Sequence, residues 1–158
     1  MIQLPKTIKM VITDFDGIIT DNCVYVDAKG DMSRKLNFKD IMAFSLLKKN
    51  GFMIAIISGE ANSAIDIIAK KFDISDVHQN IRNKLDVLKT IVCKYSLSQE
   101  EYLYVGDDVN DFDSLSFAKY AITVPKAVDK VKQIKHIQIT DNNGGDGAFR
   151  EIVDTLIY

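Results

Sequence analysis

The sequence is poor in the residues that build disulfide frameworks and soft-metal sites. Two cysteines and two histidines occur among 158 residues, and Cys23 and Cys93 do not stand at a metal-binding spacing. We expect Cys93 to lie in the core among apolar neighbours, and both thiols to be reduced. His78 and His136 are expected at the surface or in loops, without a metal role. The chemistry of the chain must therefore be carried by other side chains.

The sequence also lacks a strong excess of one charge and a long apolar run. The net charge is −2 and the pI is near 5.7, which gives no electrostatic reason to expect a nucleic-acid partner. No apolar run approaches the length that crosses a bilayer, and the N-terminus lacks the apolar core of a signal peptide. We therefore expect one domain over residues 1–158, cytoplasmic, with neither nucleic acid nor membrane as a partner.

Strand-like and helix-like segments alternate along the chain, which is typical of a parallel sheet flanked by helices. Strands are expected at residues 9–13, 52–58, 101–108, 121–124 and 136–140. Helices are expected at residues 40–51, 61–73, 84–96, 111–119, 126–135 and 147–158. Residues 23–38 differ, because alternating apolar residues flank "DAKGD", which predicts a β-hairpin with Gly30 in the turn. The predicted fold class is therefore α/β, a Rossmann-like parallel sheet with a β-hairpin insertion.

The first predicted strand ends in acid. In "KMVITDFDGIITD" (9–21) an apolar run meets Asp14 and Asp16, where carboxylates cost several kcal/mol unless they are paired or bind a cation. The carboxyl ends of parallel strands form the binding crevice of such a sheet. Further polar residues follow the second and third strands: Ser58, Gly59, Glu60, Asp107, Asp108, Asn110 and Asp111. We expect these groups to converge, although Asp108 or Asp111 alone can equally be a helix N-cap.

Carboxylates that cluster without His or Cys favour Mg²⁺ as the bound cation. Mg²⁺, a hydroxyl and the Lys84 ammonium together make a phosphate site. A carboxylate that faces the phosphoryl group can form an aspartyl phosphate, which assigns Asp14 as nucleophile. Asp16 can protonate the leaving oxygen and then deprotonate water. Asp107 would help to hold Mg²⁺, and Ser58 would bind phosphoryl oxygens.

The polar segments resemble the four ordered motifs of the haloacid dehalogenase (HAD) superfamily of phosphatases. They read "DFDGIITD", "ISGE", Lys84 and "GDDVND". The hairpin, "LNFKD" and "GGDGAFRE" resemble the capless branch typified by 3-deoxy-D-manno-octulosonate (KDO) 8-phosphate phosphatase. The resemblance implies that the Asp16 backbone carbonyl and the Asp14 and Asp107 carboxylates are Mg²⁺ ligands. It also implies a fold without a cap domain.

Members of this branch form tetramers in which a neighbouring subunit helps to close the site. The resemblance therefore implies a homotetramer. It makes the 23–38 hairpin and the segment 142–150 candidates for substrate and interface contacts. The alternative is that the hairpin is a peripheral addition to the fold that contacts neither substrate nor another subunit.

The second motif departs from the KDO 8-phosphate phosphatase pattern. Glu60 stands where those phosphatases usually carry Arg, which reverses a charge beside the substrate. Relatives that act on the 9-phosphate of the nine-carbon acid KDN carry Glu there and a lysine one helix further on, where this chain has Lys71. The resemblance thus favours a nonulosonate such as KDN or sialic acid 9-phosphate over KDO 8-phosphate. Lys71 can also be a solvated helix residue.

Three functions remain to be distinguished. The leading one is an Mg²⁺-dependent phosphatase of a phosphorylated 2-keto-3-deoxy sugar acid, which would supply cell-surface polysaccharide (lipopolysaccharide) biosynthesis. The second is a broad-specificity HAD phosphatase, because a capless site restricts substrates little. The third is a non-catalytic oligomerisation module of the kind associated with sialic-acid cytidylyltransferases. The clustered carboxylates argue against that module, because a protein without chemistry would gain nothing from the free energy that their burial costs.

Overall fold

The protein is built around one six-stranded sheet. The computed structural model describes residues 2–158, and the strand order is β5–β4–β1–β6–β7–β8 with every neighbouring pair parallel. The strands are β1 (Met10–Thr13), β4 (Met53–Ile57), β5 (Asp76–His78), β6 (Tyr102–Val105), β7 (Tyr120–Thr123) and β8 (Gln138–Ile139). The central strand β1 is completely buried, as the apolar run at its start predicts.

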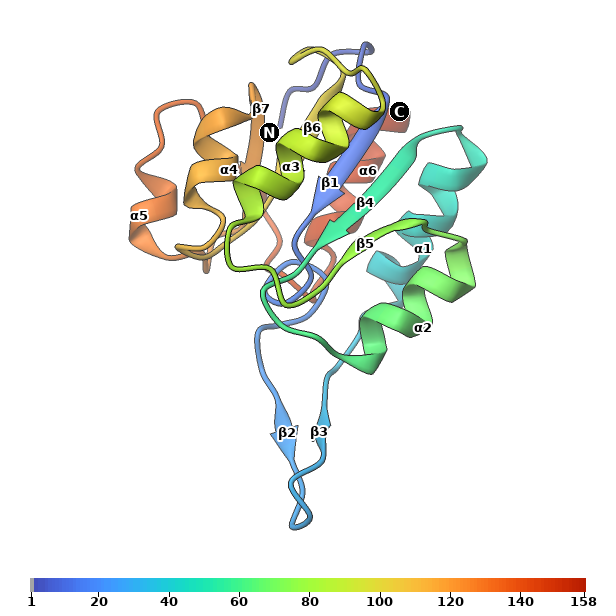
Figure 1. Ribbon diagram of the computed structural model, residues 1–158, viewed down its shortest axis with the longest axis vertical. Coiled ribbons are helices and arrows are strands. Elements are labelled where there is room, and N and C mark those ends of the chain that lie inside the picture. Colours follow the sequence, from blue (N-terminus) through green and yellow to red (C-terminus); the bar gives the residue numbers. More distant parts are fainter. Residues whose placement is uncertain (1) are drawn as a thin grey trace.

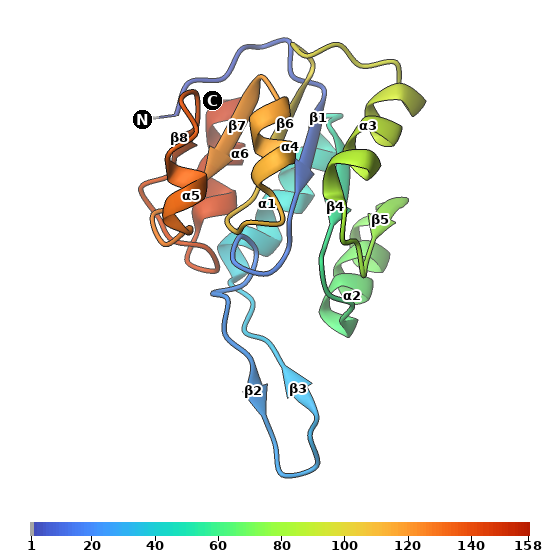
Figure 2. The same cartoon turned by 60° about the vertical axis from the view of Figure 1, so that its left-hand side comes forward.

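Helices cover both faces of the sheet, as Figures 1 and 2 show. They are α1 (Phe38–Lys49), α2 (Ser63–Phe72), α3 (Lys84–Lys94), α4 (Phe112–Phe117), α5 (Asp129–Lys132) and α6 (Ala148–Ile157). Helices α1 and α6 pack together on one face with α2 beside α1, and α3 packs with α4 on the other. This architecture confirms the predicted Rossmann-like α/β fold.

Asparagine side chains define where three helices begin. Asn37, Asn62 and Asn83 precede α1, α2 and α3, and each side-chain oxygen accepts a hydrogen bond from a backbone amide in the first turn. Each bond satisfies a donor that the helix leaves without a partner. Asn62 and Asn83 stand in the loops that follow the parallel strands β4 and β5.

Several local predictions are corrected by the structure. The three-residue edge strand β5 was not predicted, and His78 lies on it rather than in a loop. The helix expected over 126–135 is a single turn, α5. Cys93 is exposed on α3 rather than in the core, because the apolar stripe of that helix buries Leu88 and Ile91 and turns position 93 outward.

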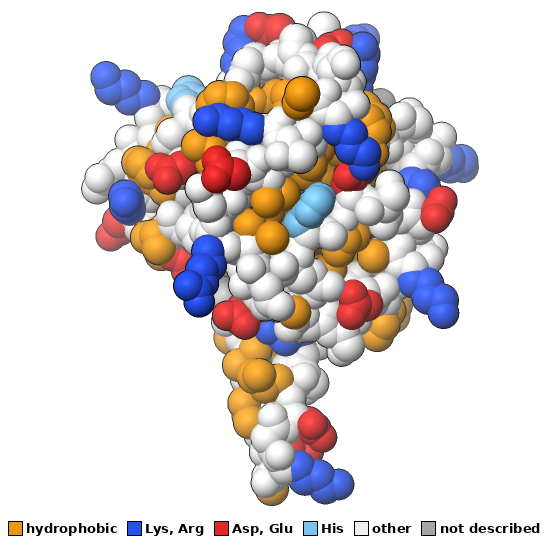
Figure 3. All heavy atoms as spheres, in the orientation of Figure 1, with side chains coloured by type: hydrophobic (Ala, Val, Ile, Leu, Met, Phe, Trp, Pro, Cys, Tyr) orange, Lys and Arg blue, Asp and Glu red, His pale blue; other side chains and the backbone are white. Residues whose placement is uncertain are grey.

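The hairpin projects beyond the carboxyl-terminal ends of the parallel strands (Figures 1 and 2). Strands β2 (Tyr25–Val26) and β3 (Met32–Ser33) pair antiparallel, and Gly30 has φ +86° in the turn, as predicted. Hydrophobic side chains line the hairpin (Figure 3), and those of Tyr25, Val26 and Met32 are about 60% exposed. Exposed apolar side chains of this kind make the hairpin a candidate interaction surface.

Beyond the sheet, its helices and this hairpin, residues 2–158 contain no inserted segment that forms a cap. None of the helices in this part of the chain has the length and apolar character needed to cross a bilayer.

Candidate active site

The polar residues predicted to converge do lie around one pocket at the carboxyl ends of β1, β4 and β6. The pocket has a volume of about 150 Å³. Its lining residues are Asp14, Asp16, Asn22, Ser58, Gly59, Glu60, Asp107, Asp108 and Asn110. Lys84 and Asp111 lie directly behind this lining, and Lys71 does not line the pocket.

A buried Asp–Lys–Asp group forms the floor of the site. Lys84, the first residue of α3, places its Nζ 2.7 Å from Asp14 Oδ2 and 2.8 Å from Asp111 Oδ1. All three residues are at most 5% exposed. Burial alone would lower the pKa of Lys84, but the charges of Asp14 and Asp111 outweigh it and raise that pKa. Lys84 therefore remains an ammonium that neutralises the two carboxylates.

Burial and neighbouring charges also act on the Asp14 carboxylate. Burial raises the pKa of Asp14 well above its usual value, and the charge of Asp111 adds to the effect, while Lys84 opposes it. The Phe15 amide donates to Asp14 Oδ1 over 2.6 Å. The side chain is thus fixed by two donors at the end of β1, facing the pocket.

Asp107 has spare capacity for a ligand. Its Oδ1 is buried and has no hydrogen-bond partner. Its Oδ2 accepts one long hydrogen bond, over 3.4 Å, from the side-chain amide of Asn22. Burial, followed by the charges of Asp111 and Asp108, raises the pKa of Asp107 to about 7. A buried acceptor without a donor is costly, so this carboxylate is suited to a cation.

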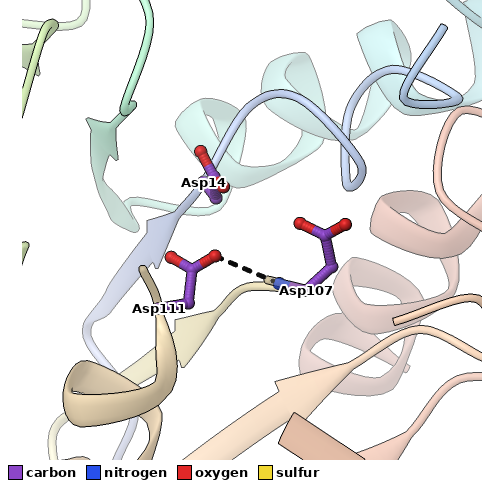
Figure 4. A group of neighbouring side chains, drawn as sticks. All are labelled: Asp14, Asp107 and Asp111. Atoms are coloured by element: carbon purple, nitrogen blue, oxygen red, sulfur yellow. Dashed lines mark hydrogen bonds between the residues drawn. The ribbon is translucent and has the colours of Figure 1, made fainter. Parts of the chain in front are cut away.

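Asp14, Asp107 and Asp111 each offer an oxygen within 4.8 Å of the others (Figure 4). Asp111 already accepts four hydrogen bonds, from Lys84, the Tyr104 hydroxyl and the backbone amides of residues 107 and 108. Asp111 therefore positions the other groups, whereas Asp14 and Asp107 are the carboxylates suited to a metal. Oxygen donors without a histidine or thiolate fit Mg²⁺, the ion predicted from the sequence.

Glycines bring the first motif close to its neighbours. Gly17 has φ +89°, and a Cβ there would lie 2.1 Å from Asp107 Oδ2. A Cβ on Gly144 would lie 1.7 Å from the Gly17 carbonyl oxygen, and the Gly145 amide donates to the Ile18 carbonyl over 3.0 Å. The loop that carries Asp14 and Asp16 is thus packed against a segment that arrives late in the sequence.

That late segment is itself anchored by a buried acid. Asp40 in α1 accepts hydrogen bonds from the backbone amides of Gly147 and Arg150, each over 3.0 Å. Burial raises the pKa of Asp40, although these bonds oppose the shift. The contact joins α1 to the start of α6 and holds the glycine-rich loop against the site.

Asp16 and Ser58 complete the pocket wall. Ser58 directly follows β4 and is 1% exposed. Its Oγ accepts a hydrogen bond from the Glu60 backbone amide over 3.3 Å. Asp16 is half-buried and contacts Thr20 and two residues that sequence reasoning missed, Arg34 and Asn62. Asn62 carried a signal as a helix-capping residue, whereas nothing in the spacing around Arg34 points to the site.

Of the two residues expected to set substrate preference, Glu60 lines the pocket and Lys71 does not. The exposed Glu60 lines the pocket, and Gly59 allows the Asn110 amide to approach, because a Cβ there would lie 2.8 Å from Nδ2. Lys71 is exposed on α2 with its Nζ over the Phe72 ring. Asp111 does occupy the N-cap position of α4, but its side chain makes no capping hydrogen bond.

A parallel α/β sheet with this buried Asp–Lys–Asp group, and with further carboxylates and a hydroxyl at the strand ends, defines a site of the metal-dependent hydrolase class. The chain belongs to the haloacid dehalogenase-like hydrolase family, which it matches over residues 19–152. The match begins just after Asp14 and Asp16. Family membership confirms the superfamily and the hydrolase class predicted from the motifs.

Relatives in this family are similar along nearly the whole chain. The 3-deoxy-D-manno-octulosonate 8-phosphate phosphatase of Yersinia pestis is 25% identical over 157 residues, which is 99% of this chain and 83% of the relative. The corresponding Moraxella catarrhalis enzyme, solved with magnesium, phosphate and KDO, is 29% identical with a TM-score of 0.90, covering 96% of this chain and 87% of that one.

A cobalt-bound phosphatase of the same kind from Haemophilus influenzae is 25% identical with a TM-score of 0.88, covering 96% and 88% of the two chains. These likenesses confirm the predicted similarity to the KDO 8-phosphate phosphatase branch. Two of the three relatives were solved with a divalent metal.

Proposed function

We propose that this chain is an Mg²⁺-dependent phosphatase that hydrolyses the phosphate monoester of a 2-keto-3-deoxy sugar acid. The observation that carries the proposal is the buried Asp14–Lys84–Asp111 group beside the unpartnered oxygen of Asp107. Such a group stabilises a carboxylate next to a place where a cation and a phosphoryl group can be bound. The activity named for the Yersinia pestis and Moraxella catarrhalis relatives supports the substrate class.

In the proposed reaction, an Asp14 carboxylate oxygen attacks phosphorus and the ester P–O bond breaks. Asp16 gives its proton to the leaving sugar oxygen, so that an alcohol departs and an aspartyl phosphate remains on Asp14. Water then attacks phosphorus while Asp16 accepts a water proton. The bond between phosphorus and the Asp14 oxygen breaks, and phosphate leaves with both residues restored.

The remaining residues would bind the phosphoryl group and Mg²⁺ and neutralise their surroundings. Ser58 is positioned to donate its hydroxyl to a phosphoryl oxygen, and Lys84 offsets the charge of the Asp14 carboxylate. The Asp14 and Asp107 carboxylates and the Asp16 backbone carbonyl would hold Mg²⁺. When bound, Mg²⁺ supplies neutralisation of the phosphoryl charge. Asp108 and Asp111 support this arrangement from the β6–α4 loop.

Substrate length is the finer part of the proposal. Glu60 at the pocket mouth favours hydroxyl groups over a carboxylate, which suits the longer polyol tail of a nine-carbon acid such as KDN 9-phosphate. Lys71 lies outside the pocket of its own chain. We propose that it reaches the substrate from another copy in a homotetramer, in which the exposed apolar side chains of the hairpin are covered.

The test is phosphate release with Mg²⁺ from KDO 8-phosphate, KDN 9-phosphate and an aryl phosphate, measured side by side. A preference for the nine-carbon ester supports the role of Glu60, and a preference for the eight-carbon ester overturns it. Similar efficiency on all three indicates a generalist phosphatase.

The matched variant is Asp14→Asn, which keeps the size of the side chain and removes the nucleophile. We expect turnover to fall at least about 1,000-fold while the circular dichroism spectrum is unchanged. Wild-type-like turnover would refute the assignment of Asp14.

A further inference from the structure

We propose that Arg34 of the hairpin is a positioning residue for Asp16, and that it fixes which carboxylate oxygen exchanges a proton with the substrate. This inference rests on the proposed function, because it assigns a partner to the acid of that reaction. It goes beyond that function by giving the segment that follows β3 a part in the chemistry of its own chain.

The contacts of Asp16 distinguish its two oxygens. Arg34 Nε lies 2.8 Å from Oδ1, and the Thr20 hydroxyl donates to the same oxygen over 3.1 Å. Oδ2 has one longer contact, 3.4 Å from the Asn62 amide. Because Oδ1 is occupied by two donors, Oδ2 is the oxygen left to give and take a proton.

The burial of Arg34 separates this ion pair from an ordinary surface pair. The Arg34 side chain is 10% exposed and that of Asp16 is 22% exposed, although Met32, two residues earlier, is 62% exposed. The next residue, Lys35, is 54% exposed and pairs with Asp21 over 3.0 Å, an arrangement that contributes little. Of these two neighbouring cations, Arg34 thus points inward and contacts Asp16, the predicted general acid.

Arginine suits this position for a geometric reason. Its guanidinium is planar and permanently charged, and Nε donates along a fixed direction, so that the bound carboxylate cannot rotate freely. Proton transfer needs the donor oxygen to be held within hydrogen-bond reach of the leaving oxygen. A freely rotating Asp16 would present the correct oxygen for only part of the time.

The test uses the dependence of the first turnover on the leaving group. A sugar alcohol needs a proton as it departs, whereas nitrophenolate leaves without one. For Arg34→Met we expect the first-turnover rate on the preferred sugar acid phosphate to fall about 10- to 100-fold. The rate on p-nitrophenyl phosphate should stay within about threefold of wild type. Arg34→Lys keeps the charge but not the planar guanidinium. We expect it to lower the rate on the sugar acid phosphate more than the rate on p-nitrophenyl phosphate, by a smaller factor than Arg34→Met does.

Two further measurements identify the cause of any loss. Mg²⁺ affinity, measured by calorimetry, should stay within about twofold in Arg34→Met, which separates positioning of Asp16 from distortion of the metal site. Lys35→Met, the adjacent hairpin cation, should show no split between the substrates.

Equal losses on both esters in the soluble Arg34→Met and Arg34→Lys proteins, or no loss on either, would overturn the role of Arg34. Those outcomes leave the phosphatase proposal standing, because it depends on wild-type turnover and on Asp14→Asn. Failure of wild-type protein to release phosphate from any ester would instead overturn the proposed function itself.

Discussion

Replacing Lys84 by methionine tests the electrostatic account of the site most directly. The ammonium lies between two carboxylates, 2.7 Å from Asp14 and 2.8 Å from Asp111, and its side chain has no exposed surface. Methionine has a similar volume, so the change removes charge and hydrogen bonds without opening a large cavity. Breaking a buried ion pair on one side costs about 3–5 kcal/mol, and we expect a loss of this size in the free energy of unfolding at pH 8.

The loss should depend on pH in a defined direction. Burial raises the pKa of Asp14 and Lys84 opposes that rise, so the variant should hold a proton on Asp14 up to higher pH. The folded variant then binds a proton that the unfolded chain has released above about pH 4. Its stability falls as pH rises through that window, at about 1.4 kcal/mol per pH unit. The loss should therefore be smaller at pH 5.5 than at pH 8.

Urea unfolding of both proteins without metal, at the two pH values, measures the effect. An unchanged dependence on denaturant would show that the compactness of the two states is the same. Lys89→Met is the matched control, because this exposed lysine of the same helix only contacts the Phe117 ring and should cost about 1 kcal/mol or less. An equal loss at both pH values, or a loss below about 1 kcal/mol at pH 8, would refute the reasoning.

Three further changes test other parts of the structure. Gly17→Ala should cost about 1–3 kcal/mol in urea unfolding and weaken Mg²⁺ binding, since φ is +89° and the new Cβ would displace Asp107; unchanged binding by calorimetry would contradict this. With the pKa of Asp107 at about 7, protons should compete with Mg²⁺ below that pH. Asp107→Asn should weaken the pH dependence of Mg²⁺ affinity, and the part that remains would come from Asp14, whose pKa is also raised. The raised pKa of Asp107 also means that metal-free stability falls by up to about 4 kcal/mol as pH rises from 4 to 7. Tyr25→Asp should lower the mass found by light scattering, because Tyr25 is 59% exposed on the hairpin, whereas a monomeric wild type would contradict the proposed assembly.

Sequence patterns predicted the sheet because its strands are buried runs. Strands β1 (Met10–Thr13) and β6 (Tyr102–Val105) are buried along their whole length, as expected for central strands of a sheet covered on both faces. The acids at their ends were predictable because buried carboxylates are costly and parallel strands end at one edge. Strand β5 was missed because three residues with an acid and a histidine carry no apolar run.

The finer structure of the site could not be predicted in the same way. Arg34 and Lys35 are adjacent cations on one hairpin, and only the direction in which the backbone twists decides which of them turns inward. The role of Asp111 depends on four donors that come from three separate segments. Such convergence is a property of tertiary packing, and no local pattern records it.

Gly144 and Gly145 contact the loop after β1, so the site joins segments that are synthesised at different times. The first motif is synthesised early, yet the loop that orients its aspartates packs against residues that follow β8. A nascent chain can therefore pair its strands before it can shape its site. The loop that orients Asp14 and Asp16 can take its final packing only after residues 144 and 145 have been synthesised.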